Sequence, residues 1–243
     1  MQEHSPIESV EAEEREDSFL QGVKDCIPTL LGYLSIGFAA GVIAKTSGLS
    51  VAEITLMSVL VYAGSAQFII AGMVAANASI AAIIFTVFFV NLRHLLLSAA
   101  LSPYFRHLTP FKNMMIGSLL TDETFGVAMY QTANRQRISE RWMLGLNITA
   151  YLNWIAATVA GALLGQWITN PERFGLDFAL PAMFIGLLVL LMVGRAKVAV
   201  DVCVAIIAVI VVIGVTLVSS PSIGVIAASV VAAAVGMVVE KWK

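Results

Sequence analysis

Long apolar runs separated by short polar segments fill the chain from residue 27 to its end. About 20 apolar residues in a helix cross a hydrocarbon core roughly 30 Å thick, so these runs predict membrane-spanning helices. The expected spans are 27–44, 51–76, 79–101, 114–133, 143–168, 178–194, 197–217 and 222–239. The pattern therefore predicts an all-α, polytopic membrane helix bundle of seven or eight spans.

Two of these boundaries carry helix-start signals. Ser50 and Glu53 have the spacing of a capping box, in which each side chain satisfies a backbone amide at the helix start. Ser220 followed by Pro221 is typical of a cap residue with proline at the first helical position.

The run 51–76 is interrupted by "YAGSAQF" at 62–68. Its polar and small residues are candidates for substrate binding: Tyr62, Gly64, Ser65 and Gln67. A broken helix here would free backbone amides that can bind a carboxylate at membrane depth. Small-residue helix packing is the simpler alternative, although a buried Gln67 amide would still need partners.

The run 79–101 contains Asn91, Arg93 and His94 in its middle. An arginine at this depth is unfavourable by about 3 kcal/mol unless a partner or a water-filled cavity offsets it. Asn91 and Arg93 are therefore further candidates for substrate binding. In the alternative interpretation the span ends at Val90 and Arg93 extends to the lipid headgroups.

The run 114–133 is the least apolar and carries Asp122 and Glu123. Either carboxyl could pair with Arg93, hold a substrate ammonium or take up a proton, or the pair could cap a helix at the interface. If this run crosses the membrane there are eight spans; if it is only partly inserted there are seven.

Basic residues in short loops predict the orientation. Arg135, Arg137 and Arg141 fall on the same side as residues 194–197 and the C-terminus, which we expect to be cytoplasmic. A crossing at 114–133 would put Arg106 and Lys112 on the wrong side. The sequence does not resolve this conflict.

A weak internal similarity links the segments that begin at Gly37 and at Gly161. Each has two glycines four residues apart, a short loop and then Gly-Leu. The similarity indicates either a duplicated unit, inverted if three spans separate the copies and parallel if four do, or two independent small-residue helix contacts.

Composition and charge agree with a membrane protein. Hydrophobic residues make up 59% of the 243 and charged residues 12%, which excludes an ordinary soluble domain. Residues 1–25 contain eight acids and two bases and predict a disordered acidic tail, which leaves residues 26–243 as a transmembrane transporter domain. Cys26 and Cys203 are far apart, with no pattern for a disulfide or a metal.

No motif for ATP binding, dinucleotide binding or hydrolysis occurs, and no basic face suits nucleic acid. We therefore expect neither an enzyme nor a cofactor-binding or metal-binding protein. A secondary transporter remains the leading class.

Four motifs in order resemble the AzlC family, the large subunit of bacterial branched-chain amino-acid exporters. They are "YAGSAQF" at 62–68, "VNLRHLLLSAALSP" at 90–103, "LLTDETFGVA" at 119–128 and "GLDFALPAMFIGLL" at 175–188. The resemblance implies proton-coupled export of valine, leucine and isoleucine, with methionine of similar size, across the bacterial inner membrane. It also implies a small AzlD-like membrane subunit as a partner.

A zwitterionic aliphatic substrate needs an anion site, a cation site and an apolar pocket. The candidates are residues 64–67 with Arg93 for the carboxylate, Asp122 or Glu123 for the ammonium or proton, and the aromatic residues Phe68, Phe88 and Phe89 for the side chain. A channel or uniporter for another small polar solute is the alternative, and it would not need a titratable carboxyl.

Overall fold

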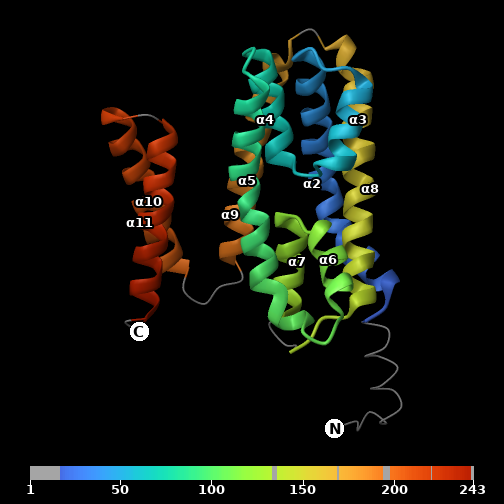
Figure 1. Ribbon diagram of the computed structural model, residues 1–243, viewed down its shortest axis with the longest axis vertical. Coiled ribbons are helices and arrows are strands. Elements are labelled where there is room, and N and C mark those ends of the chain that lie inside the picture. The colour runs from blue at the N-terminus through green and yellow to red at the C-terminus, as the bar shows by residue number, and fades with distance from the viewer. Residues whose placement is uncertain (1–16, 133–135, 169, 194–197, 220, 242–243) are drawn as a thin grey trace. The chain divides into compact units, whose positions relative to one another are not determined.

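The computed structural model describes residues 17–132, 136–168, 170–193, 198–219 and 221–241, and every regular element in these ranges is helical (Figure 1). The longer helices are α2 (Phe19–Thr46), α3 (Val51–Leu60), α4 (Gly64–Ala75), α5 (Ile80–Leu101), α6 (Pro110–Ser118), α7 (Asp122–Thr132), α8 (Glu140–Leu164), α9 (Ala179–Val193), α10 (Val198–Val218) and α11 (Pro221–Lys241). Short 3-10 turns lie at Ser102–Phe105, Gly165–Trp167, Pro171–Phe174 and Leu176–Phe178. The predicted all-α membrane bundle is confirmed.

The helices belong to two compact units, residues 1–187 and 188–243. The transporter domain expected over 26–243 contains both. Four helices of the described chain are long and apolar enough to cross a membrane: α2, α5, α8 and α10. In the second unit, α10 and α11 pack against each other.

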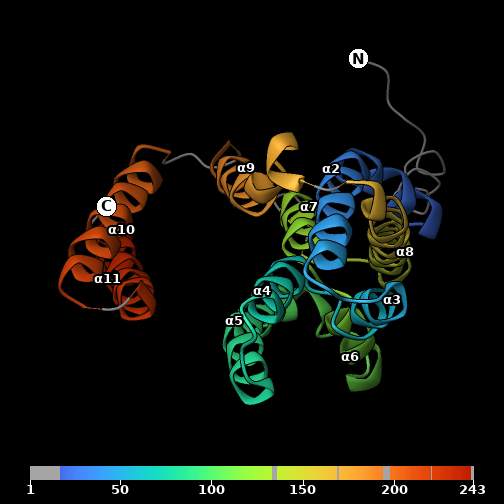
Figure 2. The same ribbon diagram turned by 90° about the horizontal axis from the view of Figure 1, so that it is seen from above.

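The first unit is built on the close, parallel packing of α2 and α8 (Figure 2). A Cβ added at any of four glycines would collide with the backbone of the facing helix: Gly22, Gly41, Gly145 and Gly161. Only glycine lets the two backbones approach this closely. The glycine pairs of the sequence similarity, at 37 and 41 and at 161 and 165, lie in this contact. Small-residue packing between two parallel helices therefore accounts for these glycines, and a duplicated unit stays a prediction.

The sequence predicted that the run 51–76 crosses the membrane once, and this prediction is wrong. The run forms a helical hairpin, because α3 of 10 residues and α4 of 12 are each about half the length of a span. Ile54 of α3 and Ala71 of α4 pack with Ala162 near the end of α8, whereas Gly64 at the tip contacts Trp154 in the middle of α8. The chain enters to mid-depth and returns to the same end (Figure 1).

The broken helix itself is confirmed, with its break at residues 61–63. Tyr62 has a φ of 41°, in the left-handed region, and Ala63 is extended. These two conformations reverse the chain direction between α3 and α4.

The run 114–133 belongs to a second hairpin, which enters from the opposite end (Figure 1). Lys112 of α6 pairs with Glu140 at the start of α8, and further along Asn147 of α8 donates a hydrogen bond to the Ile116 carbonyl at 3.1 Å. α7 then returns toward the start of α2, where Gln131 reaches Asp25 at 3.5 Å. This run does not form a single crossing helix. Because the runs 51–76 and 114–133 both fold as hairpins, the predicted count of seven or eight spans was too high.

The second hairpin explains how the basic residues before and after the run 114–133 can lie on the same side of the membrane. Arg106 and Lys112 come before α7, and Arg137 and Arg141 come after it. Because the hairpin returns to its starting end, all four lie at one end of the first unit, which we call the basic end. Arg135 and residues 194–197 lie outside the described chain.

The helix-start predictions are confirmed where they can be followed. Ser50 and Glu53 form the capping box in both directions, with bonds of 2.7 and 3.2 Å. α11 begins at Pro221, and Ser220 is outside the described residues. α2 begins at Phe19, capped by Ser18, so the helix extends into the segment assigned to the acidic tail.

Candidate functional site

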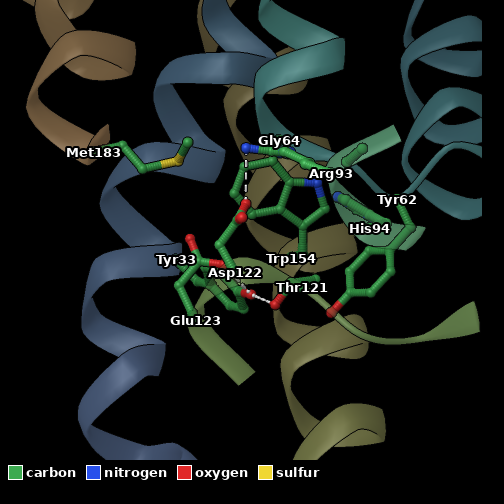
Figure 3. Close-up of a pocket in the computed structure, with 11 residues that line it drawn as sticks. Tyr33, Tyr62, Gly64, Arg93, His94, Thr121, Asp122, Glu123, Trp154 and Met183 are labelled. Atoms are coloured by element: carbon green, nitrogen blue, oxygen red, sulfur yellow. Dashed lines mark hydrogen bonds and ion pairs between the residues drawn. The ribbon is translucent and has the colours of Figure 1, made fainter. Parts of the chain in front are cut away.

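The tips of the two hairpins meet at a small pocket in the first unit (Figure 3). Its lining comes from six helices, α2, α4, α5, α7, α8 and α9, and from both tips: Tyr33, Tyr62, Ala63, Gly64, Arg93, His94, Thr121, Asp122, Glu123, Trp154 and Met183. The cavity of about 20 Å³ holds a water-sized group, so a larger ligand requires the tips to separate.

The first tip presents the start of α4. Gln67 donates the first amide bond of this helix, to the Ala63 carbonyl at 3.0 Å. The amides of Gly64, Ser65 and Ala66 precede it and have no partner within the helix. Gly64 has no side chain and lies under the Trp154 ring, where an added Cβ would be 3.0 Å from that ring. Together with the helix dipole, these amides favour an anion.

Gln67 lies behind this tip rather than in the pocket. Its side chain accepts a hydrogen bond from the Trp154 indole nitrogen at 3.2 Å and donates one to the Met57 carbonyl at 3.3 Å. Next to it, the hydroxyls of Ser58 and Thr158 are 2.7 Å apart. Gln67 therefore holds α3, α4 and α8 together, which gives its buried amide the partners it needs.

The second tip presents the start of α7, and it is acidic. Thr121 and Thr124 bond each other's backbone amides, and Asp122 and Glu123 occupy the first turn, where negative charge stabilises a helix. Each hairpin thus begins its second helix at the pocket, and the two helix starts have opposite chemical character.

The two carboxylates have different partners. Asp122 Oδ2 lies 2.9 Å from the Arg93 guanidinium (Figure 3). The same guanidinium packs over the Phe184 ring, 5.6 Å from its centroid. Glu123 Oε2 accepts a hydrogen bond from the Tyr33 hydroxyl at 2.8 Å. Tyr33 also hydrogen-bonds Thr121.

Several buried polar atoms have no hydrogen-bond partner in the described part of the chain. Those in or near the site are Tyr62 Oη, Ser65 Oγ, Asn91 Oδ1, Arg93 Nε and His94 Nε2. Buried polar groups are normally satisfied, so a group of such atoms around one pocket is typical of a site that receives a polar ligand.

The structure brings together five of the eight residues that the sequence singled out: Tyr62, Gly64, Arg93, Asp122 and Glu123. Ser65 and Gln67 are buried just behind the first tip, and Asn91 lies one turn from His94 without lining the pocket. The structure does not place the three aromatic candidates in this pocket. Phe88 and Phe89 are about 60% exposed on α5, and the buried Phe68 does not line the pocket.

Sequence reasoning missed Tyr33, Trp154 and Met183. Two are aromatic and one is apolar, and single residues of these kinds in a span usually indicate core packing. Tyr33 and Trp154 are 3% and 2% exposed, and their rings meet edge to face at 5.4 Å. The nearby Asn153 and Thr158 were the available signal for α8, since they also place polar groups in the middle of a span.

No cluster of metal-ligating side chains occurs among the described residues. Within the same residues both cysteines are free thiols, buried at Cys26 and exposed at Cys203.

Opposed half-helices, a paired arginine and a carboxylate at mid-depth define a multi-pass membrane protein with the architecture of a solute transporter. The AzlC protein family model matches residues 28–168 of this chain, which is more than half of its length. The chain belongs to the AzlC family.

Curated relatives agree with this assignment. The inner membrane protein YgaZ of Escherichia coli is 34% identical over 176 residues, which covers 70% of this chain and 72% of that protein. An uncharacterized membrane protein of Archaeoglobus fulgidus is 31% identical over 73% of this chain and 77% of its own length. The branched-chain amino acid transport protein AzlC of Bacillus subtilis is 29% identical over 65% of this chain and 62% of its own length. No solved structure matches the chain.

Proposed function

We propose that this protein is a secondary transporter that exports valine, leucine and isoleucine, and the similarly sized methionine, in exchange for protons. The name of its Bacillus subtilis relative supports the substrate class. The site supports the chemistry, because it combines groups for both charges of an amino acid with apolar side chains.

The observation that most supports this proposal is that the two hairpin tips face each other across the pocket. The amides at Gly64 to Ala66 suit the substrate carboxylate, and the acidic start of α7 suits the ammonium. The distance between the two charged groups of an α-amino acid is short, so both tips must contact one substrate molecule at once. Such a site would close around substrate and could open toward either end.

The apolar part of the pocket determines the selectivity. Trp154 and Met183 contribute apolar surface beside the charged groups. A missing or extra methylene changes binding by only about 1–3 kcal/mol, so related aliphatic amino acids should all be substrates.

We further propose that the protein lies in the bacterial inner membrane with its basic end in the cytoplasm. The exposed residues Arg106, Arg137 and Arg141 at that end support this orientation. The C-terminus would also be cytoplasmic. A small AzlD-like membrane protein would complete the transporter, and the exposed apolar length of α5 leaves a surface for such a subunit.

Efflux of preloaded labelled valine and leucine tests the proposal in cells that lack their own exporter. Wild type, Arg93→Ala and Arg93→Lys would be compared with the small subunit present and at matched membrane abundance. We expect both variants to lose export, because lysine cannot reproduce the geometry of the guanidinium at Asp122. Arg173→Ala, an exposed arginine outside the site, serves as the control. Wild-type export by both Arg93 variants would contradict the proposal.

A further inference from the structure

We propose that Glu123 alone carries the coupled proton, that Asp122 is the fixed partner of Arg93, and that Tyr33 transmits the state of Glu123 to the other hairpin. This inference rests on the proposed transport function. It separates the roles of two adjacent carboxylates that the sequence left equivalent.

Asp122 is not expected to bind the proton, because its negative charge already balances the positive charge of Arg93. Its carboxylate lies 2.9 Å from Arg93, and the two side chains are about equally shielded, with 21% and 22% of their surfaces exposed. Protonating Asp122 would leave an arginine charge in the membrane interior without a partner. The pair is therefore expected to stay ionised on both sides throughout transport.

Glu123 has no such partner among the described residues. The titratable and charged groups that face it are Asp122 on its own helix, Tyr33 on α2, Tyr62 at the first tip, and Arg93 and His94 on α5. Helices α8 and α9 contribute only the uncharged Trp154 and Met183 to the pocket. Since Arg93 and Asp122 neutralise each other, the charge of Glu123 is the one that a bound cation can balance.

One carboxylate that binds either a proton or the substrate ammonium couples the two in opposite directions. With the proton bound, the ammonium loses its counter-ion; with the amino acid bound, the proton must have left. Each cycle then exchanges one proton for one amino acid, and a proton gradient directed into the cell drives export.

Tyr33 lies where its hydrogen bonds depend on which cation Glu123 binds. Its single hydroxyl proton faces two acceptors, Glu123 Oε2 and Thr121 Oγ1. When Glu123 is ionised, Tyr33 donates to it and accepts a bond from Thr121. When Glu123 is protonated, the acid donates to Tyr33, whose proton turns to Thr121, and the Thr121 proton turns to Thr124 at 3.3 Å.

The Tyr33 ring continues this path to the first hairpin. It meets Trp154 edge to face at 5.4 Å, and Trp154 both holds Gln67 and covers Gly64. A change at the acidic tip of α7 thus reaches the start of α4 through two aromatic side chains (Figure 3).

The test is leucine exchange between equal internal and external concentrations, followed against pH in membrane vesicles that hold the full chain and the small subunit. Protons that compete at one carboxylate should lower wild-type exchange by about tenfold per pH unit on the acidic side of the midpoint. Glu123→Gln should reduce exchange by about tenfold or more and remove this pH dependence. Glu123→Asp should keep the pH dependence with a displaced midpoint, which shows that the site still folds.

Three further variants separate the three roles. Asp122→Asn should retain the pH dependence of whatever exchange survives, and combining Arg93→Asp with Asp122→Arg should recover part of the lost exchange. Tyr33→Phe should slow exchange and displace the midpoint, because it removes the hydroxyl that joins Glu123 to Thr121. Tyr130→Phe on the exposed side of α7 and Glu172→Gln should match wild type.

The possible failures are distinguishable. A wild-type pH profile in Glu123→Gln, or loss of pH dependence in Asp122→Asn alone, would overturn this inference while leaving transport intact. Absence of leucine exchange by the wild-type protein at every pH would overturn the proposed function and this inference with it.

Discussion

The two hairpins at the centre of the first unit, α3–α4 and α6–α7, follow one plan with opposite chemistry. Each consists of two half-length helices, and each begins its second helix at mid-depth. α4 starts with Gly64 and Ser65 and no charged residue, while α7 starts with Asp122 and Glu123. A helix start attracts negative charge. The start of α4 can therefore bind an external anion, whereas the start of α7 already carries two acidic side chains.

This difference shows how two half-length hairpins that enter from opposite ends can form the zwitterion site that we propose. A symmetric pair of bare tips would bind two anions, and a symmetric acidic pair would bind two cations. Because the second tip is acidic and the first is bare, the site has a direction that an amino acid can match.

The largest effect is expected from breaking the α2–α8 frame on which both hairpins rest. Gly41→Ala puts a Cβ against the Thr158 carbonyl, so the two helices must separate, at a cost of about 3 kcal/mol. We expect most of the folded protein to be lost in detergent gel filtration. Gly32→Ala is the matched control, since nothing lies within 4 Å of its Cβ. Equal folding of the two variants would mean that the close contact is absent.

The next largest effect concerns the acidic hairpin. Asp122→Asn leaves Arg93 without its partner and should lower leucine export by about tenfold or more, since an unpaired arginine at this depth is unfavourable by about 3 kcal/mol. Exchanging the two charges, with Arg93→Asp and Asp122→Arg, should recover part of the loss. Export assays on the two single variants and the double variant measure the coupling. Strictly additive losses would show that the pair does not interact.

A smaller effect is expected at the bare hairpin. Gly64→Ala puts a methyl group 3.0 Å from the Trp154 ring, beside the amides proposed to bind the carboxylate. The half-saturating leucine concentration should rise by about fivefold, with little loss of maximal rate. Gly72→Ala in the same helix has open space around it and should behave as wild type. An unchanged half-saturation in Gly64→Ala would move the anion site elsewhere.

The smallest effect is expected from the helix caps at the starts of the two hairpins. α3 starts with the Ser50–Glu53 capping box, whereas Thr109 before α6 makes no side-chain capping bond. Ser50→Ala should therefore destabilise the protein by about 1 kcal/mol, and Thr109→Ala by only a few tenths. Thermal unfolding of purified protein would measure both changes. A larger effect at Thr109 would contradict this assignment of the caps.

Sequence patterns were sufficient for the long helices and for much of the site's chemistry. The bounds of α5 and α9 differ from prediction by at most one residue at each end, and Arg93, Asp122 and Glu123 were identified because charge is rare in such runs. The hairpins could not be predicted in the same way. A single crossing and a half-depth hairpin both need apolar side chains throughout, so hydropathy along 51–76 does not distinguish them.

The remaining errors have similar causes. The reversal at Tyr62 depends on a positive φ in a residue that rarely adopts one, which no local pattern indicates. Tyr33 and Trp154 owe their roles to neighbours far along the chain, Glu123 and Gln67. The outward direction of Phe88 and Phe89 depends on how α5 is rotated against the bundle, and the nearly uniform apolarity of that helix does not fix its rotation.

The central claim, that the hairpins enter from opposite ends and do not cross, is tested most directly by the reactivity of single cysteines toward an impermeant maleimide. Ser47→Cys and Asn77→Cys flank the first hairpin, and His107→Cys and Gln136→Cys flank the second, in a chain with Cys26 and Cys203 replaced by serine. We predict that Ser47→Cys and Asn77→Cys react from one side of the membrane, and His107→Cys and Gln136→Cys from the other. Reaction of Ser47→Cys and Asn77→Cys from opposite sides would show that residues 51–76 cross the membrane and would contradict the account.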